Sequence, residues 1–339
     1  MSNSYKAVEV TTPGTLHVVD RPVREPGIGQ VRIRVDACGI CHTDAATVEG
    51  IFPGLTFPRV PGHEVVGRIE ATGPGVSRWS IGQRVGVGFF GGEDGACEPC
   101  RRGDIVHCQN PVYPGITTDG GYAEVMIAEA RGLASIPDAL APAEAAPLLC
   151  AGLTTFNALR NAGLRAGDLV AVQGIGGLGH LGVQFARHMG FHTVAVGRGS
   201  EKGKLAEDLG AHLYIDTTTE DAATALQRMG GAVAILATAT SGDAIAKLVG
   251  GLAPRGKMIV VGAPQDPIQV NAAQLIFGAR SIYGALTGTA VDNEDTLAFS
   301  VLQKIRPMVQ TFPLERAAEA YASMMQGKAR FRIVLVTGR

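Results

Sequence analysis

The stretch that decides the fold is AVQGIGGLGHLG, residues 171–182. Gly174, Gly176 and Gly179 form a G-x-G-x-x-G pattern between a strand-like apolar run and a helix-like run. In that context the glycines permit a tight turn, close approach of the backbone to a pyrophosphate and close helix–strand packing, while the helix N-terminus attracts negative charge. The pattern predicts a dinucleotide site that also includes Gly177 and Leu178. A plain tight turn is the alternative, because the chain has 46 glycines.

The residues around this motif, 151–286, predict a parallel sheet covered by helices. Apolar runs such as DLVAVQG, HTVAVG, VAILATA and KMIVVGA alternate there with helix-like stretches, which is typical of a doubly wound α/β domain. Residues 1–150 are rich in Gly and Pro and hold short runs such as QVRIRVDACGI, which favour an antiparallel β-rich domain. Within residues 287–339, the closing run ARFRIVLVTG is expected to be a strand that rejoins the first domain.

Composition narrows the classes of partner. The 339 residues carry a formal net charge of -1 and no run of like charge, which argues against a nucleic acid or an anionic membrane as partner. We see no transmembrane span. The start MSNSYKAVEV lacks the basic and apolar blocks of a secretory signal, so a cytoplasmic location is expected. In a reducing cytosol, clustered cysteines are more often metal ligands or catalytic thiols than disulfides.

The choice of dinucleotide depends on the end of the next predicted strand, HTVAVGRGSEK, residues 192–202. An NAD site usually holds an Asp or Glu there for the ribose hydroxyls, whereas an NADP site replaces the acid with a cation. This chain has Gly197 followed by Arg198, with Lys202 close behind. The sequence therefore favours NADP over NAD, and an acid at position 197 is expected to reverse the preference. Alternatively, Arg198 stacks on the adenine or points into solvent.

The first domain supplies candidate metal ligands. Cys41 in ACGICHTD and His63 in PGHEVVG stand at loop-like positions, and Cys150 in PLLCAGLTTFNAL stands at the boundary between the two domains. Zinc prefers thiolate and imidazole, and three protein ligands with one open position describe a catalytic rather than a structural zinc. Taken singly, Cys41 and His63 could equally be a core cysteine and a turn histidine.

Six segments in order, GICHTD, PGHEVVG, DGGYAEV, LLCAGLTTFNAL, GIGGLG and GKARFRIVLV, are together similar to the zinc-dependent alcohol dehydrogenases of the medium-chain dehydrogenase/reductase superfamily. The similarity covers essentially the whole chain. It implies a GroES-like β-rich catalytic domain plus a Rossmann doubly wound parallel-sheet cofactor domain. It also implies reversible hydride transfer between a primary or secondary alcohol and NAD(P), the products being an aldehyde or a ketone.

The resemblance also implies roles around the catalytic zinc. Cys41, His63 and Cys150 correspond to its ligands. Thr43 corresponds to the residue whose hydroxyl receives the alcohol proton. Asp44 corresponds to the acid that orients His63, and Glu64 to the acid that lies behind the metal. His42 corresponds to a position facing the cofactor pyrophosphate, with a proton-relay role second. Many relatives have a relay histidine where this chain has Ala46, so the proton route departs from the family pattern. Asp44 and Glu64 could alternatively be turn-capping acids.

The stretch DGACEPCRRGDIVHC, residues 94–108, resembles the lobe that holds a second, structural zinc in family members. Three of the four family cysteines match Cys97, Cys100 and Cys108, and the fourth position is Asp94. A carboxylate oxygen is a legitimate but harder zinc ligand, so a site of reduced affinity is expected. A lobe with free thiols is the alternative. Cys38 is read as buried core.

Softer implied contacts complete the set. They are Thr154 at the nicotinamide, Val261, Ala285 and Leu286 at the carboxamide, Arg332 at the pyrophosphate, and Phe52 with one of Phe89 or Phe90 at the substrate. The resemblance also implies a homotetramer joined through edges such as SIYGALTG. Cys150 argues against a polyol dehydrogenase, which would typically offer Glu as third ligand, and the presence of Cys41, His63 and Cys150 argues against a zinc-free quinone or enoyl reductase. A non-catalytic NADPH-binding zinc/thiol redox sensor is the alternative of a different class.

Overall fold

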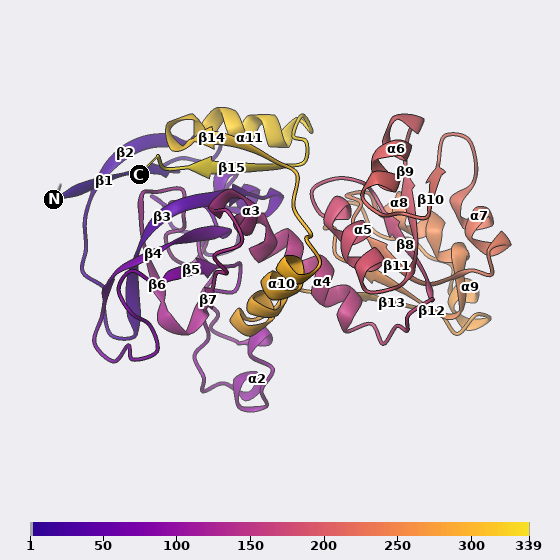
Figure 1. The fold of residues 1–339 in the computed structure, drawn as a ribbon, viewed down its shortest axis with the longest axis horizontal. Coiled ribbons are helices and arrows are strands. Elements are labelled where there is room, and N and C mark those ends of the chain that lie inside the picture. The colour runs from indigo at the N-terminus through magenta and orange to yellow at the C-terminus, as the bar shows by residue number, and fades with distance from the viewer. Residues whose placement is uncertain (1–2, 339) are drawn as a thin grey trace. The chain divides into compact units, whose positions relative to one another are not determined.

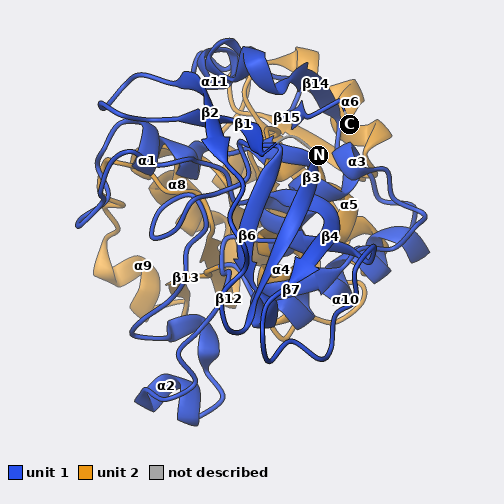
Figure 2. Ribbon diagram, turned by 90° about the vertical axis from the view of Figure 1, so that its left-hand side faces the viewer, with its two compact units in different colours: residues 1–153, 287–339 blue, residues 154–286 orange. Residues whose placement is uncertain are grey.

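The computed structural model describes residues 3–338, and the chain divides into two compact units (Figure 2). Unit 1 comprises Met1–Leu153 and Thr287–Arg339, and unit 2 comprises Thr154–Leu286. The chain therefore passes between the units at 153/154 and 286/287, whereas the sequence placed the first boundary at 150, inside the turn that ends the first part of unit 1. Among the described residues, no helix has the length and apolar character needed to cross a membrane.

Unit 1 is built on a mixed, mainly antiparallel sheet of order β14-β15-β3-β4-β5-β7, with β6 also paired to β3 and a separate β1-β2 ribbon. Its strands are β1 (Ser4–Glu9), β2 (His17–Pro22), β3 (Gln30–Ile40), β4 (Val65–Thr72), β5 (Arg84–Val87), β6 (Val125–Glu129), β7 (Leu133–Ser135), β14 (Val309–Pro313) and β15 (Arg332–Val336). Its helices are α1 (Ala45–Val48), α2 (Glu98–Arg101), α3 (Pro142–Pro147), α10 (Ala290–Leu302) and α11 (Ala317–Met325).

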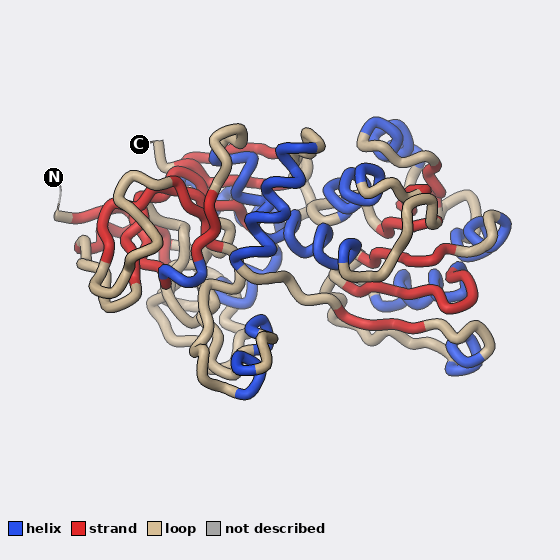
Figure 3. Tube along the Cα trace, turned by 60° about the horizontal axis from the view of Figure 1, so that its bottom comes forward, coloured by secondary structure: helices blue, strands red, loops and turns tan. Residues whose placement is uncertain are grey.

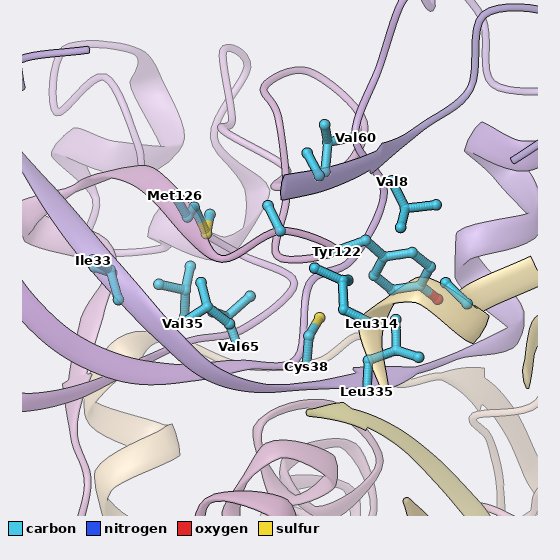
Figure 4. Close-up of a cluster of buried hydrophobic side chains, with 14 of the residues drawn as sticks. Val8, Ile33, Val35, Cys38, Val60, Val65, Tyr122, Met126, Leu314 and Leu335 are labelled. Atoms are coloured by element: carbon cyan, nitrogen blue, oxygen red, sulfur yellow. The ribbon is translucent and has the colours of Figure 1, made fainter. Parts of the chain in front are cut away.

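Strand β3 organises unit 1 because it pairs with β4, β6 and β15. Its apolar residues Val31, Ile33 and Val35 are buried and alternate with half-buried polar residues, as expected of a strand with one face on a core. Figure 4 shows Ile33 and Val35 in that core with Tyr122 and Leu335. The closing strand β15 lies antiparallel to β3, with Leu335 opposite Cys38 (Figure 1).

Unit 2 is a six-stranded parallel sheet of order β10-β9-β8-β11-β12-β13 with helices on its two faces (Figure 3). Its strands are β8 (Leu169–Gln173), β9 (His192–Gly197), β10 (Leu213–Asp216), β11 (Ala232–Ala237), β12 (Leu252–Val260) and β13 (Ser281–Gly284). Its helices are α4 (Leu153–Arg160), which begins at the unit boundary, α5 (Gly179–His188), α6 (Gly203–Asp208), α7 (Ala222–Arg228), α8 (Gly242–Leu248) and α9 (Ala272–Ile276). Every residue of β8 is buried, as in a central strand covered on both faces.

Candidate active site

Four metal-binding side chains of unit 1 converge on one point. Ligand atoms of Cys41, His63, Glu64 and Cys150 all lie within 4.8 Å of one another. The two Sγ atoms are 3.9 Å apart, and none of the six cysteines forms a disulfide. The structure thus brings together the three ligands predicted for the catalytic zinc, with Glu64 behind them.

Neighbouring strands explain this convergence. Cys41 follows the last residue of β3 and caps the 3-10 turn η1 (His42–Asp44), and His63 and Glu64 immediately precede β4. Since β3 and β4 are antiparallel, with Cys38 opposite Val65, the end of one strand lies beside the start of the next. Cys150 lies in a π-helical turn, η4 (Leu148–Gly152), a rare conformation found frequently at functional sites.

Asp44 is the centre of the buried hydrogen-bond network beside the cluster. One of its oxygens lies 3.0 Å from His63 Nδ1. The other accepts a hydrogen bond from the Tyr122 hydroxyl at 2.9 Å and one from the Cys41 backbone N–H at 2.9 Å. Because Nδ1 donates its proton to Asp44, a neutral His63 has its lone pair on Nε2. That Nε2 is buried and has no hydrogen-bond partner among the described residues.

Two glycines make room for this arrangement. Gly62, directly before His63, has φ of +104°, and a Cβ there would lie 2.5 Å from the Tyr122 ring. A Cβ at Gly39 would lie 1.9 Å from the Glu64 carboxylate. Both positions therefore exclude any larger residue for steric reasons.

Glu64 forms a buried ion pair with Arg332 of β15. The guanidinium also donates to the Ile40 carbonyl at 3.1 Å, and Arg332 is 6% exposed. The sequence predicts that Arg332 contacts the cofactor pyrophosphate, and that contact stays a prediction. Within unit 1 its guanidinium bonds Glu64 and the Ile40 carbonyl. The other Glu64 oxygen is buried without a hydrogen-bond partner among the described residues, and burial raises the Glu64 pKa to about 7.

The buried charges favour a thiolate in the cluster. A hydrogen bond from the Cys150 thiol, helped by His63, holds the pKa of Cys41 well below its usual value. Burial alone would lower the pKa of His63, but the Asp44 carboxylate raises it well above its usual value. The Cys150 thiol, beside the Cys41 sulfur and buried, has a raised pKa. A cation among these groups would favour the ionised thiol at both cysteines.

The residues predicted to move protons lie around η1. Thr43 Oγ1 is 3.5 Å from Cys41 Sγ, so its hydroxyl lies beside the cluster. His42 is exposed and Ala46 is half-buried. The structure gives His42 access to solvent, whereas its predicted contact with the pyrophosphate stays a prediction.

Aromatic rings continue from His63 outward. The rings of His63 and Phe89 meet edge to face at 5.4 Å, Phe89 stacks on Tyr113 at 4.6 Å, and Tyr113 meets Phe52 at 6.4 Å. Phe90 is 3% exposed and belongs to the core. Of the two alternatives left by the sequence, Phe89 is the one that contacts the cluster.

A second group of metal-binding side chains lies on the lobe that carries α2 (Figure 1). Ligand atoms of Asp94, Cys97, Cys100 and Cys108 lie within 4.8 Å of one another. The Asp94 and Gln109 N–H groups donate to the Cys108 and Cys97 sulfurs, each at 3.4 Å, which stabilises thiolates. The donor set of three sulfurs and one carboxylate oxygen fits a tetrahedral zinc.

Asp94 is also held by the chain around it. One of its oxygens accepts from the N–H groups of Ala96 at 2.9 Å and Cys97 at 3.0 Å, and the other accepts from the Asn110 amide at 2.7 Å. These hydrogen bonds, that from Asn110 foremost, hold the Asp94 pKa far below its usual range. These hydrogen bonds favour the ionised carboxylate and fix its orientation beside the three sulfurs.

The glycine motif lies in unit 2 between β8 and α5 as expected of a Rossmann turn. Gly174 has φ of +87°, and a Cβ at Gly179 would lie 1.7 Å from the Gly174 carbonyl. A Cβ at Gly176, in contrast, would meet nothing within 4 Å. The chain itself does not require that glycine, so the open space above it fits a pyrophosphate.

A cavity of about 500 Å³ lies in unit 2 beside this turn. Gly174, Gly197, Arg198 and Lys202 line it. Gly177 and Leu178 lie in the turn and are half-buried. The remaining predicted contacts lie at Thr154 on α4, Val261 after β12, and Ala285 and Leu286 after β13.

Sequence reasoning missed several residues that these sites depend on. Tyr122 lies inside the quoted segment DGGYAEV, where a tyrosine between glycine and a strand was the available signal. Tyr113 and Asn110 have no such signal, because their partners are fixed by tertiary packing.

Comparison with known proteins identifies the family of the chain. Residues 27–138 match the alcohol dehydrogenase GroES-like domain and residues 177–302 match the zinc-binding dehydrogenase domain. The alcohol dehydrogenase notN of Aspergillus sp. (strain MF297-2) is 41% identical over 94% of each chain. The chain belongs to the zinc-type alcohol dehydrogenases of the medium-chain dehydrogenase/reductase superfamily.

Solved structures of this family support the same fold. A crystal structure of an NAD-dependent alcohol dehydrogenase has a TM-score of 0.91 and 28% identity, covering 98% of this chain and 100% of that one. The structure of CAD from Helicobacter pylori complexed with NADP(H) has a TM-score of 0.85 and 26% identity, covering 100% and 99%. The family assignment makes this protein an oxidoreductase with alcohol dehydrogenase activity, for which zinc and a nicotinamide dinucleotide are the cofactors. Since neighbours of both cofactor types share the fold, the fold alone does not choose between NAD and NADP.

Proposed function

We propose that the enzyme is a zinc-dependent alcohol dehydrogenase whose catalytic zinc is held by Cys41, His63 and Cys150. The observation that carries this proposal is the buried, partnerless Nε2 of His63, since a buried polar atom without a partner costs free energy unless a ligand satisfies it. The two sulfur atoms beside it complete a Cys2His donor set, which is the known catalytic zinc set of alcohol dehydrogenase. Glu64 lies behind this set, bound to Arg332.

When bound, the zinc supplies Lewis acidity that stabilises negative charge on the substrate oxygen during hydride transfer. Residues of the chain orient the metal ligand His63 and exchange the proton of the alcohol. Asp44 holds His63 in the tautomer that directs a lone pair at the metal. Thr43, with its hydroxyl beside the cluster, exchanges the alcohol proton. Exposed His42 and water carry that proton onward, because Ala46 cannot.

For the cofactor we propose NADP in preference to NAD. Arg198 and Lys202 line the cavity of unit 2 and form no hydrogen bond or ion pair within residues 3–338. Three acids also line the cavity. Glu220 pairs with Arg228 and Asp243 with Lys247, and Asp221 accepts a hydrogen bond from the Thr224 N–H at the start of α7, so two unpaired cations stand against one acid without a cation partner. The free charge at the cavity is therefore positive, which suits a 2′-phosphate.

The aromatic series Phe89, Tyr113 and Phe52 supports a substrate with an apolar body. Flat rings beside His63 offer faces for an alkyl chain or an aromatic ring of the alcohol. We infer primary or secondary alcohols of this kind, or the corresponding aldehydes and ketones, as substrates.

Two further parts of the proposal concern the lobe and the assembly. Asp94, Cys97, Cys100 and Cys108 hold a structural zinc. A homotetramer is supported by the edge strand β13, because Tyr283 on the strand and Leu286 just after it are 37% and 48% exposed. Ile276, the last residue of α9, and Phe277, its C-cap, are also exposed. Light scattering tests this assembly, and a monomer would contradict it. The cytoplasmic location stays a prediction.

The deciding experiment removes one ligand. The Cys150→Ala variant is expected to lose alcohol oxidation and one zinc ion per chain by mass spectrometry, while NADPH binding by fluorescence persists. The control is Cys38→Ala, which removes a thiol outside both metal clusters and keeps the zinc content of the wild type. Turnover by Cys150→Ala with its zinc lost would overturn the proposal.

A further inference from the structure

The loop that carries Arg198 and Lys202 rests on one aromatic side chain. Tyr214 of β10 lies next to β9 in the parallel sheet, with Tyr214 opposite Ala195 and Asp216 opposite Gly197. A Cβ at Gly203, the first residue of α6, would lie 3.3 Å from the Tyr214 ring. The ring thus lies inside the loop that joins β9 to α6.

Position 197 is closed by this ring. A Cβ on Gly197 would lie 2.6 Å from the Tyr214 hydroxyl oxygen and 3.0 Å from a ring carbon. Gly197 does not have a left-handed φ, so its backbone would accept other residues. The requirement for glycine therefore comes from the tyrosine. An Asp or Glu at the end of β9, the group that recognises the ribose hydroxyls of NAD, needs the space that the tyrosine fills.

The tyrosine cannot easily swing away, because its hydroxyl is bound. It donates to the Gly199 carbonyl at 2.7 Å, and the Gly199 N–H donates to Asp216 at 2.9 Å. Gly199 has φ of +88°, a conformation that glycine adopts readily. Both backbone groups of this residue are therefore held by β10, directly beside Arg198. Burial, with Asp216 and Glu201 nearby, raises the Tyr214 pKa to about 12, so the hydroxyl keeps its proton.

We propose that Tyr214 is a positioning residue that determines cofactor choice, by excluding a carboxylate from position 197 and by holding the loop so that Arg198 faces the 2′-phosphate. This inference rests on the proposed preference for NADP and adds its structural origin. The absence of an acid at the end of β9 is then a consequence of packing from the neighbouring strand. A single substitution at position 197 is not sufficient to convert the enzyme to NAD, contrary to the expectation from sequence.

The test compares dissociation constants for NADPH and NADH, measured by nicotinamide fluorescence, with thermal melting of each variant. Tyr214→Phe keeps the ring and removes the bond to Gly199. It should weaken NADPH binding about threefold to tenfold and change NADH binding by less than about twofold, since NADH has no 2′-phosphate for Arg198 to contact. The matched control is Tyr283→Phe on β13, which lies outside the cavity lining and should leave both constants unchanged.

The steric half is tested by a double-mutant cycle. Gly197→Asp alone should melt at a lower temperature and bind neither cofactor well. Gly197→Asp with Tyr214→Val should recover stability and bind NADH at least about tenfold more tightly than Gly197→Asp alone, as expected when a pair of charge-assisted hydrogen bonds becomes possible. Tyr214→Val alone completes the cycle.

The results separate this inference from the preference on which it rests. Equal binding of NADPH and NADH by the wild type, or an equal effect of Arg198→Ala on both, would refute the NADP preference; the double-mutant cycle would still measure the steric effect of Tyr214. A Gly197→Asp variant that melts like the wild type and prefers NADH without a second change would overturn the inference. So would a Tyr214→Phe variant that weakens both cofactors equally.

Discussion

The Asp44→Asn substitution should weaken zinc binding at the catalytic cluster more than its small change in size suggests. Asp44 accepts hydrogen bonds from three donors: His63 Nδ1, the Tyr122 hydroxyl and the Cys41 N–H. An asparagine has only one acceptor atom, and its NH2 group must face one side or the other. If the NH2 faces His63, the ring must protonate Nε2 and the lone pair no longer points at the metal. If it faces the other side, the Cys41 N–H, which cannot rotate, loses its acceptor.

The expected loss of zinc affinity can be worked out for either orientation of the new amide. Leaving one buried polar group unpaired costs about 1 to 3 kcal/mol, which is about fivefold to 150-fold in an equilibrium constant at 1.4 kcal/mol per tenfold. Loss of a residue that orients a metal-bound histidine typically costs 10-fold to 100-fold in metal affinity or activity. We therefore expect Asp44→Asn to lower zinc affinity at this cluster about 10-fold to 100-fold.

The assay measures zinc affinity by competition with a chromophoric chelator. Cys150→Ala serves as the baseline, because in that variant only the lobe is expected to retain zinc. Tyr122→Phe is the matched comparison, because it removes one of the three donors to Asp44. Each Asp44 oxygen still accepts one hydrogen bond, from His63 Nδ1 or from the Cys41 N–H. Tyr122→Phe should lower zinc affinity less than Asp44→Asn does, because the Asp44 carboxylate keeps its charge and both of these hydrogen bonds. Zinc affinity of Asp44→Asn within about twofold of the wild type, at an unchanged melting temperature, would show that Asp44 does not set the histidine tautomer.

Three other predictions follow from the two metal clusters and the loop before α6. Asp94→Cys should retain zinc in the lobe against higher chelator concentrations than the wild type, because thiolate is the softer ligand; earlier release would refute the carboxylate as a ligand. Arg332→Met should lower the free energy of unfolding by about 3 to 5 kcal/mol because it leaves Glu64 buried without its partner, and Arg332→Met with Glu64→Leu should recover part of that loss in denaturant titrations. Hydrogen bonds from Thr218 hold the Asp216 pKa below its ordinary 3.8. Ionised Asp216 therefore stabilises the fold fully above pH 3.8, and this stabilisation disappears as the pH falls through the lowered pKa. In Asp216→Asn, the melting temperature should fall less steeply with decreasing pH in this range than it does in the wild type.

The sequence predicts which side chains come together at the two clusters, because most of them are close in chain order or on neighbouring strands. Cys41 and His63 stand where β3 ends and β4 begins, so pairing of consecutive strands is enough to join them. The glycine motif is likewise local, since one turn between β8 and α5 contains all of it. Motif spacing is therefore enough to predict the family, the fold class and the two groups of candidate ligands.

Residues that support those ligands are less accessible to sequence reasoning because their partners are distant. Tyr122 bonds an aspartate 78 positions away, and Arg332 pairs with a glutamate 268 positions away. For Gly197, the missing information was the side chain on the neighbouring strand. Position 197 alone suggests that any acid would fit, whereas strand register places Tyr214 in the required space. Such contacts depend on packing across strands and not on a sequence period.

The pairing of β15 with β3 has a consequence for biosynthesis. Translation passes from β3 and Cys41 through the whole of unit 2 before it reaches Arg332 and β15, the strand that pairs with β3. Unit 2, which is continuous from 154 to 286, can fold while translation continues, since domains generally fold as units during synthesis. Unit 1 cannot complete its sheet until β15 has also left the ribosome. We therefore expect zinc loading at the catalytic cluster to follow the folding of unit 2, and deletion of β15, which carries the Arg332 partner of Glu64, should impair it even though no proposed zinc ligand is lost.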